Sequence, residues 1–190
     1  MNAVDYFYRI RNLLLRPGAQ WAAVASCEKD NRAVYREIVL PAICLIAVCT
    51  ALGALLFVSR AEEIWGYIVR KILLLACSLS AGLYLSAFLV NALMILHIGP
   101  RNMRGVFSLM AHTAGVIYPV IAVVALFPFF SELSILAFYA IYVYWRGIPH
   151  MLSVGVERRP IFMVVSLAAA AAVHLLIFYF FGQFLTAVIQ

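Results

Sequence analysis

The segment 105–149 constrains the possible fold more strongly than any other part of this chain. It consists of two apolar runs, 106–127 and 133–145, joined by a turn around 129–132. Both runs are apolar on every side rather than along one stripe. In a chain of 190 residues, such helices need lipid around them and other helices between them. The segment therefore predicts an integral membrane protein.

The composition of the whole chain supports this class. Hydrophobic residues make up 66% of the chain and charged residues 12%, and the mean hydropathy is +1.02. A soluble domain has roughly half apolar and a quarter charged residues, so a soluble core could not hide this much apolar surface. We therefore expect one all-α, polytopic membrane domain whose main solvent is the bilayer.

Five apolar segments predict a five-helix transmembrane bundle over residues 38–190. The first segment has about 21 residues, which extend ~31 Å as a helix and match the hydrocarbon core of a bilayer. The predicted spans are 38–58, 72–98, 106–127, 133–149 and 161–184.

Residues 1–37 precede these spans and are too polar to cross a membrane. Read as a helix, the first part has an apolar side and a polar side, and the polar side carries Asp5, Arg9, Asn12 and Arg16. Pro17 and Gly18 end this helix, and Trp21 follows where its ring can lie at the interface with its N–H in water. We therefore predict a cytoplasmic, amphipathic interfacial foot that lies on lipid or docks on a soluble partner. The foot carries Arg9, Arg16, Pro17 and Trp21.

Two features of the second and third spans predict how the helices pack. Ser78, Gly82 and Ser86 recur at intervals of four, and small residues at that spacing let another helix approach closely. We expect an internal contact at these positions, although a dimer seam uses the same pattern. Pro119 removes a backbone hydrogen bond inside the third span, which predicts a kink near 115–119.

A polar cavity between the third and fourth spans is the candidate site. Ionisable groups at membrane depth mark ligand or ion pathways, because burying a charge there costs at least ~2.5 kcal/mol. His112 and His174 are the central ionisable residues of the predicted spans, and either can also be an ordinary hydrogen-bonded packing residue. The candidate cavity consists of His112, Tyr118, Tyr139, Tyr142 and Arg146.

Sequence patterns for catalysis and metal binding are absent. The four histidines form no H-E-x-x-H motif, the four cysteines form no C-x-x-C pair, and no serine lies in a G-x-S-x-G motif. The net charge of +6 comes from basic residues dispersed among short connections, which disfavours nucleic-acid binding. We therefore expect no catalytic residue, no metal, no cofactor and no nucleic-acid partner.

The positions of the basic residues predict the orientation. With the N-terminus inside, only Arg60, Arg70 and Lys71 of the 14 lysines and arginines fall in segments outside the cell. Cytoplasmic loops carry an excess of Lys and Arg, so we expect a cytoplasmic N-terminus and, with five spans, a C-terminus on the periplasmic side.

The order of several short motifs resembles the Yip family (Rab/Ypt-interacting-protein-like) of five-span membrane proteins, in its bacterial branch. The motifs are Leu15-Arg16-Pro17-x-x-x-Trp21, Gly99-Pro100 through Arg104, Ala111, Tyr118-Pro119, Phe127-Pro128, Tyr142-x-Tyr144-x-x-Gly147-Ile148-Pro149 and Glu157-Arg158-Arg159. The resemblance implies a compact five-helix bundle in a bacterial inner membrane with a cytoplasmic N-terminus. Eukaryotic members bind Rab-type GTPases and one another, but this chain lacks their long cytoplasmic region and acidic N-terminal motif. The family supplies no catalytic residue.

These features favour a non-enzymatic function. The first expectation is a scaffold or accessory subunit that binds membrane lipids, a membrane-protein partner or a second copy of itself. The alternative is a transporter or channel for a small or lipid-like molecule that uses the candidate polar cavity. A membrane enzyme is disfavoured because no pattern of reactive side chains is present.

Overall fold

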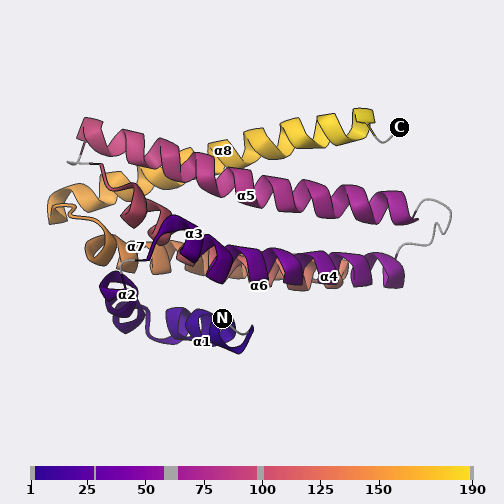
Figure 1. The fold of residues 1–190 in the computed structure, drawn as a ribbon, viewed down its shortest axis with the longest axis horizontal. Coiled ribbons are helices and arrows are strands. Elements are labelled where there is room, and N and C mark those ends of the chain that lie inside the picture. Colours follow the sequence, from indigo (N-terminus) through magenta and orange to yellow (C-terminus); the bar gives the residue numbers. More distant parts are fainter. Residues whose placement is uncertain (1–2, 28, 58–63, 98–100, 189–190) are drawn as a thin grey trace.

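The computed structural model describes residues 3–27, 29–57, 64–97 and 101–188, and the chain in these ranges is helical and has no strand (Figure 1). This confirms the predicted all-α class. The helices are α1 (Ala3–Leu15), α2 (Pro17–Ser26), α3 (Asn31–Val34), the π-helical turn η1 (Tyr35–Val39), α4 (Leu40–Phe57), α5 (Ile64–His97), α6 (Met103–Leu126), the 3-10 helix η3 (Pro128–Phe138), α7 (Tyr139–Met151), the 3-10 turn η4 (Val156–Arg158) and α8 (Arg159–Val188).

Four helical segments of the described chain are long and apolar enough to cross a membrane. They are Asn31–Phe57, Ile64–Met94, Met103–Leu126 and Val156–Phe184. The segment 133–149, expected as a further span, is divided between η3 and α7, and neither helix reaches the length of the other four. The four long helices fit a membrane protein.

The long helices form two pairs that lie side by side (Figure 1). α5 packs along α8, and α4 packs along α6. Two α5 positions of the small-residue pattern contact His174 of α8. A Cβ added at Gly82 would lie 2.7 Å from the His174 ring, and Ser86 Oγ lies 3.4 Å from His174 Nδ1. Ser78 is buried on the same helix, so this pattern lies in a contact within the chain.

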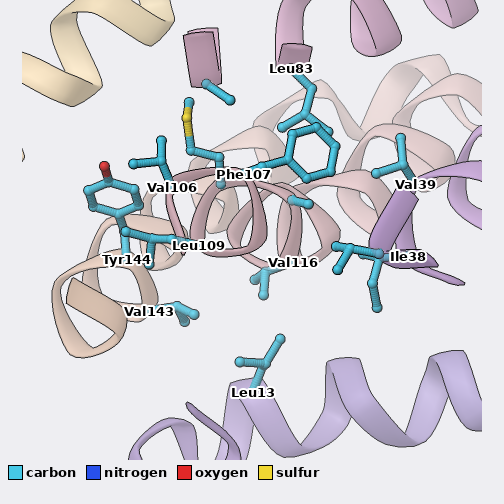
Figure 2. Packing of buried hydrophobic residues seen from close by; sticks show 14 of the residues in the cluster. Leu13, Ile38, Val39, Leu83, Val106, Phe107, Leu109, Val116, Val143 and Tyr144 are labelled. Carbon is cyan, nitrogen blue, oxygen red and sulfur yellow. The ribbon is translucent and has the colours of Figure 1, made fainter. Parts of the chain in front are cut away.

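α6 is the central helix of the fold. Residues 105–113 are all buried, because α1 and α3, α4, α5 and α7 surround this part of the helix. Figure 2 shows side chains from these neighbours, among them Leu13, Ile38, Leu83 and Val143, pointing toward α6. Pro119 lies inside α6, which continues as a helix to Leu126, so this proline does not end the helix.

Helices η3 and α7 carry the chain back along α6. α7 ends beside the start of α6, where Asn102 Nδ2 donates to the Met151 carbonyl oxygen at 3.4 Å. Gly105 faces the same oxygen so closely that a Cβ there would lie 2.5 Å from it. As a result, α8 begins at the end of the bundle where α6 begins (Figure 1).

The N-terminal helices cover the bundle rather than lying apart from it. Tyr6, Ile10 and Leu13 of α1 are buried. Tyr6 OH donates to the Gly115 carbonyl oxygen of α6 at 3.4 Å. The apolar side of α1 thus meets protein, where the sequence predicted contact with the headgroup plane, because α6 offers a complementary apolar surface. Phe7 remains 53% exposed on the other side of α1.

The prediction that the Trp21 N–H lies in water is wrong. Trp21 is 0% exposed, and its Nε1 donates to the Val143 carbonyl oxygen of α7 at 3.0 Å. A backbone carbonyl of a neighbouring helix satisfies the indole donor as well as water does, while the large ring gains burial. Pro17 is buried at the first position of α2, whereas Arg16 is exposed.

Candidate functional site

The five residues of the predicted polar cavity do not line one cavity. His112 and Tyr118 are buried on α6. Tyr139 and Tyr142 stack with ring centroids 5.5 Å apart and are partly exposed on the outside of α7, where Tyr139 OH donates to the Leu14 carbonyl oxygen at 2.8 Å.

The α7 residues are separated from His112 and Tyr118 because their side of α7 is not the side that packs on α6. Tyr139, Tyr142 and Arg146 do share one helix face, as their spacing predicted. That face meets the N-terminal helices, because the Arg146 guanidinium lies 2.9 Å from the position of a Cβ at Gly18. The buried residues of α7 are Ala140, Val143, Tyr144, Gly147 and Ile148. Periodicity identified the shared face but not the element that it contacts.

A cavity of about 430 Å³ lies at the start of α6, between α6, the N-terminal helices and the end of α7. We call it the foot cavity. Its polar lining residues come from five different segments and include Arg9, Gln20, Lys29, Arg104, His112 and His150. Val24, Val34 and Met151 contribute apolar walls. Of the predicted cavity residues, His112 is the one in this lining.

His112 belongs to this lining, and its imidazole has one polar atom without a partner among the described residues. His112 is 2% exposed, and its Nδ1 lies 2.8 Å from the Ser108 carbonyl oxygen one turn earlier, so Nδ1–H donates to that oxygen. Nε2 has no hydrogen-bond partner among the residues that the structure describes. Trp21 packs against the ring at a centroid distance of 5.8 Å. A buried polar atom without a partner costs free energy, so a ligand that bonds to Nε2 would gain that energy on binding.

Two basic lining residues share one carboxylate. Arg9 Nη1 lies 2.8 Å and Lys29 Nζ 2.5 Å from Glu37 Oε2. Glu37 lies in η1, directly before α4. The two ion pairs therefore connect α1 and the segment before α3 to η1. Because two cations face one anion, the cluster keeps one positive charge in excess. Arg104 and His150 have no hydrogen-bond or ion-pair partner within the described parts of the chain.

The N-terminus of α6 also borders the foot cavity. Asn102 caps this helix, since its Oδ1 accepts a hydrogen bond from the Gly105 backbone N–H at 2.9 Å. Asn102, Arg104 and Gly105 all line the cavity. A helix N-terminus carries partial positive charge from its unpaired backbone N–H groups, so this end of α6 favours a negative ligand.

A second, mostly apolar cavity of about 310 Å³ lies toward the other end of α6. Its lining includes Ile117, Val120 and Val124 of α6, with Lys71 of α5 and Pro128 of η3. Buried residues, among them Thr113 and Val116, occupy the part of α6 between the two cavities. The two cavities are therefore separate features of the bundle.

The described His, Cys, Asp and Glu side chains are dispersed. No group of three or more His, Cys, Asp or Glu side chains there could hold a metal ion. The four cysteines, Cys27, Cys44, Cys49 and Cys77, form no disulfide. Sequence reasoning missed Gln20, Lys29, Arg104 and His150 as cavity residues. A cap residue followed closely by a cation, as in Asn102 and Arg104, is the signal that could have identified the α6 end.

Comparisons with family models, with curated proteins and with solved structures found no match to this chain. The resemblance to the Yip family therefore rests on the motifs of the sequence.

Proposed function

We propose that this chain is a non-enzymatic, Yip-type integral membrane protein that crosses the membrane five times and acts as a scaffold or accessory subunit. The outward surface of α8 is the observation that carries this proposal. The number of crossings and the orientation decide which surfaces of the bundle face lipid.

The segment 128–151 supports a fifth crossing. It combines 11 residues of 3-10 helix with 13 residues of α-helix. η3 bends at Phe130, so the continuous part is 131–151; at rises of about 2.0 and 1.5 Å per residue it extends roughly 35 Å, which exceeds the ~30 Å hydrocarbon core. The exposed side chains of η3 include Ile135, Leu136 and Phe138, which suit lipid. Its 3-10 hydrogen bonds satisfy the backbone within the segment, as a crossing requires.

The distribution of basic residues supports a cytoplasmic N-terminus in a bacterial inner membrane. Cys27 is exposed at the end of α2 and reports on this orientation. In a variant with Cys44, Cys49 and Cys77 replaced by alanine, a membrane-impermeant maleimide is expected to label Cys27 in inside-out vesicles and not in right-side-out vesicles. The reverse pattern would place the N-terminus outside.

α8 is the least covered of the long helices. In the most apolar 18-residue stretch of each helix, 17% is buried for α8 and 50% for α6. The C-terminal half of α8 carries large side chains whose exposed fractions exceed one half. They are Leu175, Leu176, Phe178, Tyr179, Phe180 and Phe184. An exposed aromatic surface of this size suits edge-to-face contact with another helix. We assign it to a transmembrane helix of a protein partner.

Photocross-linking in native membranes tests this assignment. Phe180 on α8 and Phe88 on α5 are a matched pair, because their exposed fractions are 67% and 66%. Each is replaced in turn by a photoreactive benzoylphenylalanine. We expect a discrete protein adduct from position 180, identified by mass spectrometry, and none from position 88. An adduct with a second copy would make the partner the chain itself. Lipid adducts alone, or the same protein adducts from both positions, would contradict the assignment.

Transport of a small molecule, the alternative from the sequence, receives less support. It required a shared cavity at membrane depth, whereas only His112 of the five expected residues reaches the foot cavity. Tyr139 and Tyr142 contact α1 and each other instead.

A further inference from the structure

We propose that the foot cavity is a binding site for a phosphate-type oxyanion, carried either by a lipid headgroup or by a soluble phosphate. This inference does not depend on the scaffold role. It rests on three features of the cavity that favour the same ligand chemistry: an excess of positive charge, a buried imidazole without a second partner, and the N-terminus of a long helix.

The charge excess is built into the lining. Arg9, Lys29 and Arg104 bring three cationic groups to one cavity, and Glu37 offsets one of them. Arg9 and Lys29 each donate one hydrogen bond to the Glu37 carboxylate. Their remaining N–H groups are available to a ligand. Their side chains are only 28% and 27% exposed, which reduces screening by solvent and salt.

His112 supplies the buried polar atom that a ligand would satisfy. Its Nδ1 is committed to Ser108, so Nε2 is the free end of the ring. Arg9 and Lys29 line the same cavity as this imidazole, so all three groups border one volume. Neutral Nε2 accepts a hydrogen bond, so it can be satisfied by a phosphate oxygen that carries a proton or by a hydroxyl of a glycerol headgroup.

The start of α6 completes the set of donors. Asn102 and Gly105 are already bonded to each other, which leaves the backbone N–H groups of Met103 and Arg104 in the first turn. Backbone N–H groups at a helix N-terminus bind phosphate readily, and the Arg104 guanidinium lies in the same turn. A guanidinium and a helix N-terminus together favour phosphate over a simple halide.

The position of the cavity fits a ligand with an apolar part. Glu37 immediately precedes the apolar run that begins at Ile38, so the cavity lies at the level where the predicted first span begins. Val24, Val34 and Met151 line the same space as the cations. A volume of about 430 Å³ exceeds what a bare phosphate fills and lies in the range of small-molecule sites. A glycerol or sugar group attached to the phosphate would occupy the rest.

The test follows the rate at which a water-soluble maleimide modifies Cys27, which lines the foot cavity and is exposed. The full-length protein, with Cys44, Cys49 and Cys77 replaced by alanine, is used in dodecyl maltoside. Inorganic phosphate is expected to slow the modification severalfold, whereas potassium chloride at the same ionic strength is not. In nanodiscs, phosphatidylcholine with and without phosphatidylglycerol provides the lipid arm.

Two arginines close in sequence provide matched variants. Arg104→Gln removes a lining charge and is expected to weaken phosphate protection by about tenfold, since a charge-assisted hydrogen bond is lost. Arg101→Gln removes the same charge from an exposed residue outside the lining and is expected to leave protection unchanged. His112→Phe retains an aromatic ring without Nε2 and is expected to weaken protection as well.

The outcomes separate the two sources of the anion. Protection by inorganic phosphate identifies a site for soluble phosphates, and protection by phosphatidylglycerol alone identifies a headgroup site. The proposal is overturned if neither probe slows the modification, if chloride slows it equally, or if Arg101→Gln and Arg104→Gln lose protection to the same degree. Because Arg104 is exposed, its variant is expected to fold even if His112→Phe does not.

Discussion

Replacing Trp21 with alanine is expected to lower the free energy of unfolding by about 3–5 kcal/mol, the range typical of a large aromatic side chain removed from a core. Trp21 is 0% exposed and lies against the α6–α7 contact, where a Cβ at Gly147 would be 2.6 Å from its ring. The substitution also leaves the Val143 carbonyl oxygen without its 3.0 Å hydrogen bond. The N-terminal helices are expected to loosen from α6 and α7.

The measurement is unfolding in mixed detergent micelles with increasing dodecyl sulfate, followed by far-ultraviolet circular dichroism. Trp65→Ala is the matched control, because Trp65 is 68% exposed on α5 and its loss is expected to change the free energy of unfolding by less than about 0.5 kcal/mol. Equal losses for the two variants would mean that Trp21 is not a core residue and would remove the support for a foot docked on α6.

Gly53→Ala is expected to separate α4 from α6 and to destabilise the bundle by about 1–3 kcal/mol or more. A Cβ at position 53 would lie 2.2 Å from the Ala125 carbonyl oxygen and 2.9 Å from that of Leu126. Both are backbone atoms of α6, so no side-chain rotation can relieve the overlap. Small residues at helix contacts in membranes allow this closeness, and one methyl group removes it.

Gly66→Ala is the control, for which the free energy of unfolding is expected to stay the same or to rise. Gly66 lies in α5, and nothing is within 4 Å of an added Cβ there. Alanine is expected to be neutral or to stabilise the helix by up to ~1 kcal/mol, because it restricts the unfolded chain. The same dodecyl sulfate titration compares both variants. A Gly53→Ala variant as stable as the original protein would show that α4 and α6 do not meet as closely as described.

Local properties of the sequence predicted the helical elements well. The chain break expected at Pro17 and Gly18 falls between α1, which ends at Leu15, and α2, which begins at Pro17. The first predicted span, 38–58, nearly matches α4. These features follow from hydropathy and from the backbone limits of proline, which depend on neighbours along the chain.

The candidate site could be predicted only in part. His112 was identified because an ionisable residue in an apolar span is conspicuous. Tyr139, Tyr142 and Arg146 were placed on one face correctly, but that face meets the N-terminal helices. Polar residues of the foot cavity come from α1, α2, the segment before α3, α6 and α7, and no spacing along the sequence relates them.

By itself, the sequence determined that this chain is helical, that its long helices suit a membrane, and where most of those helices begin and end. Only the tertiary structure decided that Trp21 is a core residue and that Arg9, Lys29, Arg104 and His112 surround one cavity. The physical reason is that helix formation and hydropathy are sums over neighbouring residues. Which face of a helix is covered depends instead on contacts between segments far apart in the chain, such as Trp21 with Val143.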